Sequence, residues 1–86
     1  MKLKEGFITY ETGTEAMLVP AGSTGFSGLV KGNKTLGIIL DLLKEETTEA
    51  AMIGALQDRF DAPEDVIVRD VRNVRTELRG IGALDD

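Results

Sequence analysis

The sequence predicts an α+β domain in which three short strands are followed by three helices. Between residues 7 and 31, β-branched, aromatic and other apolar residues form short runs separated by turn-forming residues, which is typical of strands. After residue 33 the apolar residues recur every three or four positions, which is the period of an amphipathic helix. Strands grouped ahead of helices favour the α+β class.

The first two predicted strands form a hairpin and the third strand lies beside it. Phe7–Glu11 and Glu15–Val19 are the hairpin strands, and Thr12–Thr14 is the turn between them. After a loop rich in small and polar residues, Phe26–Lys31 forms the third strand, in which Gly28 indicates a bulge or a close backbone approach. We therefore expect a three-stranded antiparallel sheet with two edges that must be covered or used.

The first two helices are expected to begin at polar caps. Asn33 is a favourable N-cap for the first helix, Lys44–Glu46 separates the two helices, and Thr47 or Thr48 caps the second. Their apolar faces are Leu36, Ile38, Ile39, Leu40, Leu42 and Leu43 in the first helix and Met52, Ile53, Leu56 and Phe60 in the second. Each helix also contains a glycine, Gly37 and Gly54. Because glycine disfavours helix interiors, we interpret both as sites of close helix–helix contact.

The third helix has the clearest pattern in the chain. Pro63 suits its first helical position, and Gly80 and Gly82 are expected to end it. Its apolar stripe is Ile67, Val71, Val74, Leu78 and Ile81. An acidic shoulder, defined as Asp70 and Glu77, borders one side of this stripe. The other side carries a basic shoulder, defined as Arg72, Arg75 and Arg79, with Val68 among the arginines.

Composition limits the possible functions. The 86 residues suit one domain with one small core, and they include no cysteine and no histidine. Disulfides, thiol nucleophiles and histidine acid–base catalysis are thereby excluded, and no metal site, cofactor or catalytic residue is expected. No apolar run is long enough for a signal peptide or a membrane span, so we expect no membrane partner and a cytoplasmic location.

The order and spacing of several short motifs resemble one known family. These residues are Asn33-Lys34-Thr35, Ile39-Leu40, Thr48-Glu49, Leu56, Phe60, Asp70-Val71, Val74, Leu78 and Gly82-Ala83-Leu84. Over about residues 7–84 the chain resembles the PqqD family, named for coenzyme PQQ synthesis protein D, whose domain is also called the RiPP recognition element. The chain departs from the family pattern at Gly32, where leucine is usual, and at Arg75, where an aliphatic residue is usual.

The resemblance implies a small winged helix-turn-helix-like domain, spanning residues 1–86, that binds peptides and is not an enzyme. It implies that the leader segment of a ribosomally made precursor peptide is held as an added strand on the third strand, beside the third helix. The leader is then presented to a modifying enzyme, often a radical SAM protein, as in PQQ biosynthesis. The expected peptide contacts are Ser27, Gly28, Leu29, Val30, Lys31, Val68, Val71, Arg72, Arg75 and Arg79.

Two alternatives remain open at this point. The helix order and the arginines also fit a winged-helix DNA-binding regulator, although a net charge of −5 disfavours approach to a phosphate backbone and no nucleic acid partner is expected. The exposed edge strand also allows a monomer to form a weak homodimer. For the basic shoulder, the alternatives are a solvated face paired with nearby acids or a surface that attracts acidic groups of a leader.

Overall fold

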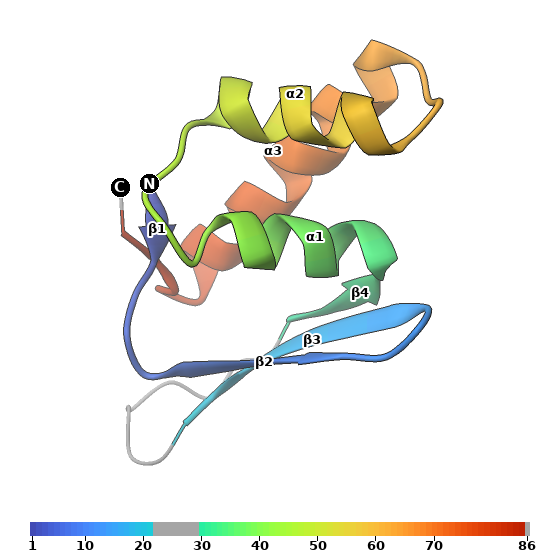
Figure 1. Cartoon of the computed structure of the whole chain (residues 1–86). Coiled ribbons are helices and arrows are strands. Elements are labelled where there is room, and N and C mark those ends of the chain that lie inside the picture. The colour runs from blue at the N-terminus through green and yellow to red at the C-terminus, as the bar shows by residue number, and fades with distance from the viewer. Residues whose placement is uncertain (22–29, 86) are drawn as a thin grey trace.

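The computed structural model describes residues 1–21 and 30–85, and within them it contains three helices and two small antiparallel sheets (Figure 1). The elements are β1 (Lys2–Leu3), β2 (Phe7–Glu11), β3 (Glu15–Pro20), β4 (Val30–Asn33), α1 (Lys34–Leu42), α2 (Glu49–Arg59), α3 (Glu64–Gly80) and β5 (Leu84–Asp85). The three-stranded sheet β2-β3-β4 comes before the helices, so the predicted α+β class is confirmed.

The predicted hairpin is confirmed as β2 and β3. The two strands pair antiparallel from Phe7 opposite Pro20 to Glu11 opposite Ala16. Thr12 closes the turn, because its hydroxyl oxygen accepts a hydrogen bond of 3.0 Å from the Glu15 N–H. A threonine hydroxyl bonded to nearby backbone offers the chain a local alternative to the ladder, which favours a turn at this point.

The third strand differs from its predicted range. Strand β4 runs from Val30 to Asn33, whereas the prediction placed it at Phe26–Lys31. Residues 22–29 lie outside the described part of the chain, so Ser27, Gly28 and Leu29 are not placed. At the other end, Gly32 and Asn33 lie beyond the predicted strand but pair with β3. Asn33 ends the strand and caps α1 at once, so no loop separates the two elements.

The core lies mainly between the three-stranded sheet and the helices. In Figure 1, α1 crosses one face of the sheet, α2 lies on the far side of α1, and α3 runs behind α1 from the level of α2 down toward the level of the sheet. The buried residues of the core are Ala16, Leu18, Val30, Leu36, Ile38, Ile39, Leu40, Leu43, Met52, Leu56, Ile67, Val71, Leu78, Ala83 and Leu84. They include most of the predicted helical faces, which confirms the orientation assigned to each helix from its apolar period.

Two of the three predicted helix starts are confirmed in detail. The Asn33 side chain accepts from the Leu36 N–H at 3.3 Å, and the Thr48 hydroxyl accepts from the Ala51 N–H at 3.1 Å. Pro63, by contrast, is the N-cap of α3 and not its first helical residue, because its ψ of 144° is extended. After α3, Gly82 has a φ of 75°, a conformation that favours glycine and ends the helix as predicted. No helix in the described residues is long and apolar enough to cross a membrane.

The sequence did not indicate the short sheet formed by β1 and β5. Lys2 pairs with Asp85 and Leu3 pairs with Leu84, so the two ends of the described chain lie side by side. The Leu3 N–H also donates to the Leu43 carbonyl at 2.8 Å, just beyond α1. Through β1, these contacts link the segment after α3 to the end of α1.

The interpretation of the helical glycines as helix–helix contacts is wrong. A Cβ added at Gly37 would lie 3.1 Å from the Ala16 Cβ and 3.1 Å from a Glu11 carboxylate oxygen, so α1 is close to the sheet and not to another helix there. A Cβ added at Gly54 would meet no described atom within 4 Å. Space therefore requires a glycine at most at the first of these positions.

Substituting Gly54 with alanine should raise the free energy of unfolding by about 0.5–1 kcal/mol, because alanine loses less backbone entropy in a helix and no contact opposes it. Gly37→Ala should gain less, because Ala16 would have to move. Urea denaturation of both variants would test this pair. Equal stabilisation of the two proteins would show that α1 does not lie this close to β3.

Candidate functional site

Strand β4 is one edge of the larger sheet, and β2 is the other. The hydrogen bonds between the strands show which backbone groups of β4 face outward. The Thr12 N–H donates to the Glu15 carbonyl at 2.9 Å, and the Ala21 N–H donates to the Gly6 carbonyl at 2.8 Å. In β3 and just beyond its end, the odd-numbered residues therefore direct their backbone N–H and C=O groups toward β2. Backbone groups alternate sides along an antiparallel strand, so Ala16 directs its N–H and C=O toward β4.

The register transfers this alternation to β4. Ala16 lies opposite Gly32, and Leu18 lies opposite Val30, so Gly32 and Val30 are the β4 residues that exchange hydrogen bonds with β3. Lys31 lies between them and directs its N–H and C=O to the other side. Among the described residues, β4 pairs only with β3. The Lys31 backbone is thus available to a further strand.

A groove of about 190 Å³ lies beside this edge, between β4 and α3. It is lined by Lys31, Gly32, Asn33, Thr35, Leu36, Asp70, Asn73, Val74 and Glu77. The strand, the first turn of α1 and one side of α3 all contribute to it. An extended segment that paired with β4 would therefore also meet side chains from both helices.

The groove has an apolar floor and a charged rim. Leu36 is buried and Val74 is half-buried, and both present carbon atoms to the groove. On the α3 side the rim is the acidic shoulder, in which Asp70 is half-buried and Glu77 is exposed. On the β4 side the rim carries Lys31, whose ammonium lies 3.9 Å from a carboxylate oxygen of Glu15.

The packing of α3 decides which shoulder faces β4. Ile67, Val71 and Leu78 are buried against the core, and this stripe fixes the rotation of the helix. Asp70 and Glu77 are seven residues apart, close to two helical turns, so both lie on the same side of the stripe. That side turns toward the sheet edge. The sequence identified the two shoulders but did not indicate that the acidic one lines the groove.

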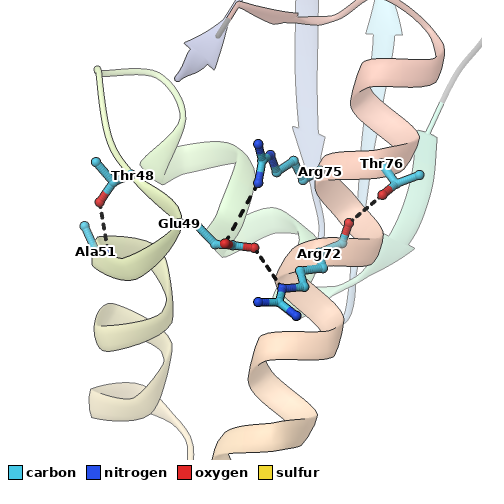
Figure 2. A network of polar contacts seen from close by, with 6 residues as sticks. All are labelled: Thr48, Glu49, Ala51, Arg72, Arg75 and Thr76. Atoms are coloured by element: carbon cyan, nitrogen blue, oxygen red, sulfur yellow. Dashed lines mark hydrogen bonds and ion pairs between the residues drawn. The ribbon is translucent and has the colours of Figure 1, made fainter.

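The basic shoulder lies on the opposite side of α3, facing α2 (Figure 2). The Arg72 Nε is 3.3 Å from one carboxylate oxygen of Glu49, and an Arg75 guanidinium nitrogen is 3.9 Å from the other. Arg79 lines the same surface. Glu49 is in the first turn of α2, where the helix dipole favours a carboxylate. None of the three arginines lines the β4 groove, and their predicted contact with a leader stays a prediction.

The remaining predicted contacts are dispersed. Val71 is fully buried, and its side chain belongs to the core beneath the groove. Val68 is half-buried and lines a separate hollow of about 580 Å³ near the start of α3. Of the two predicted strand residues that the structure describes, Val30 is buried and Lys31 lines the groove. Sequence reasoning predicted none of the other lining residues as peptide contacts, Asp70, Asn73 and Glu77 among them. The seven-residue spacing of the acidic shoulder was the available signal for Asp70 and Glu77.

Comparison with known proteins identifies the family of this chain. The family model of coenzyme PQQ synthesis protein D, PqqD, matches residues 15–84. The chain belongs to the PqqD family. A solved structure described as TbiB1 in complex with the TbiA(beta) leader peptide is similar, with a TM-score of 0.72 and 19% sequence identity over 99% of this chain and 100% of that one. At that identity the likeness establishes a shared fold. No curated protein matches this PqqD-family chain.

Proposed function

We propose that this PqqD-family chain binds the leader segment of a ribosomally made precursor peptide as an added strand along β4. The observation that carries the proposal is the outward-facing backbone of Lys31 beside the groove between β4 and α3. Main-chain hydrogen bonds to an open sheet edge supply affinity, and side-chain pockets beside it supply specificity. Membership of the PqqD family and the fold shared with a leader-bound protein support the same reading.

We further propose that residues 1–86 act as a single non-catalytic domain that presents the bound leader to a modifying enzyme, with a radical SAM protein as the expected partner. This part rests on the family and not on a described contact. Co-expression with a candidate radical SAM enzyme and a precursor, followed by affinity purification, would test it. Recovery of the precursor without the enzyme would support leader binding but not the proposed partner.

The DNA-binding alternative has less support from the site. Two of the arginines on α3 are close to Glu49, and the side of α3 that faces the groove carries Asp70 and Glu77. Carboxylates on the same helix oppose the approach of a phosphate backbone. The charge distribution on α3 therefore favours a peptide.

Amide hydrogen exchange tests the binding mode residue by residue. Peptides that bind the folded chain, selected from a display library of short random sequences, should slow exchange at Lys31 and Asn33, whose N–H groups face the open edge. The amides of Val30 and Gly32 already bond to β3 and should change little. Peptides that bind without protecting Lys31 would contradict addition to this edge.

A further inference from the structure

We infer that the peptide strand accepted at β4 carries a basic side chain, lysine or arginine, facing α3. This inference rests on the proposed function and deepens it by naming the chemistry of the ligand. The carboxylates of Asp70 and Glu77 line the groove, and within the described residues neither forms an ion pair or a side-chain hydrogen bond. The acidic rim therefore has no cation of its own on the α3 side.

Loss of water from the groove carboxylates makes the charge of the bound peptide residue important for affinity. A strand added to β4 lies about 4.8 Å from it, and so covers the groove. Asp70 is already half-buried, and a peptide over it would remove more of its water. A carboxylate that loses water without gaining a partner is strongly disfavoured, whereas a charge-assisted hydrogen bond from lysine or arginine offsets that loss. Acidic side chains at the same place would add repulsion.

Lys31, the one cation among the described residues of the groove, does not replace the ligand's charge. Lys31 stands on the β4 side, and its ammonium is within 3.9 Å of Glu15. Both of these side chains are more than half exposed, so water already solvates them. Counting Lys31 together with Asp70 and Glu77, the described groove residues carry a net charge of −1.

The apolar floor adds a second requirement for the same face of the peptide. Val74 and Leu36 lie between the rims, so a peptide residue that faces α3 near them should be apolar. Successive side chains of a strand point to opposite faces, so two residues on the same face are an even number of positions apart. The basic and the apolar residue should therefore have such a spacing. The ligand class is therefore an extended segment with a basic and an apolar residue on one face.

Display selection against three forms of the protein tests the inference. The wild type should enrich random peptides that contain lysine or arginine, and Asp70→Asn/Glu77→Gln should lose that enrichment. The matched control is Glu45→Gln/Asp58→Asn, which removes the same net charge from exposed positions outside the groove. This control should enrich basic peptides as the wild type does, which separates the groove from a general attraction to an acidic protein.

Titration of one enriched peptide then measures the coupling. Replacing its basic residue with glutamine should weaken binding to the wild type about tenfold or more, and weaken binding to Asp70→Asn/Glu77→Gln less than threefold. Equal losses on both proteins would overturn the inference. So would enriched peptides without a basic residue that still protect the Lys31 amide, although the proposed function would then stand. If no enriched peptide protects that amide, the proposed function itself fails.

Discussion

Replacing Leu78 with alanine should lower the free energy of unfolding by about 2–5 kcal/mol, the range for truncating a fully buried leucine. Leu78 has no exposed surface and lies in the buried stripe of α3. Its carbonyl accepts a hydrogen bond of 2.9 Å from the Ala83 N–H, at the turn into β5. A cavity here would loosen the helix that carries both shoulders, so the loss should also reduce the precision of the groove.

Chemical denaturation in urea measures this effect, with Arg69→Ala as the matched control on the same helix. Arg69 is exposed, and its truncation should change stability by no more than about 0.5 kcal/mol. A Leu78→Ala midpoint close to that of the wild type would show that the buried face of α3 has been assigned wrongly. The orientation of the acidic shoulder toward β4 would then be wrong as well.

The sequence predicted the elements whose signals are local. Helical periods and the caps at Asn33 and Thr48 depend on residues within one or two turns. They predicted the starts of α1 and α2 correctly. Gly82 and the Thr12 turn are local in the same sense. The pairing of Leu3 with Leu84 is not local, and two-residue strands have no period to read. The β1–β5 sheet was therefore missed.

The site was predicted less well than the fold because it depends on tertiary packing. The sequence separates α3 into an acidic and a basic shoulder, and the structure has both. Which of them faces β4 follows from how α3 docks on the core and on α2, and that information is spread over the whole chain. Arg72 and Arg75 form ion pairs with Glu49, the first residue of α2. These pairs show that the basic shoulder faces α2.

The outward backbone groups of β4 also needed the three-dimensional register. The sequence alone does not show which of the two backbone N–H groups, that of Val30 or that of Lys31, faces the open side of the edge strand. Once Ala16 is paired with Gly32 and Leu18 with Val30, the two positions differ, because the Val30 N–H belongs to the ladder and the Lys31 N–H does not. This difference permits a test that changes the open edge without removing a bond from the sheet.

Replacing Lys31 with proline should reduce peptide affinity about tenfold or more while the protein stays folded. Proline has no N–H, so a carbonyl of the added strand would be left without its partner, at a cost of about 1–3 kcal/mol. Edge strands tolerate proline where its missing N–H faces away from the sheet, as at this position. Isothermal titration with a selected peptide measures the affinity, and circular dichroism with urea denaturation monitors folding.

Two further variants isolate the backbone from the side chain. Lys31→Ala removes the ammonium near Glu15 but keeps the N–H, and should retain affinity within about threefold, because exposed ion pairs contribute little. Val30→Pro removes an N–H that bonds to Leu18 and a buried side chain, and so should destabilise the fold itself. If Lys31→Pro folds and binds as Lys31→Ala does, the peptide does not add to β4, because no other difference between the two variants removes a donor from the open edge.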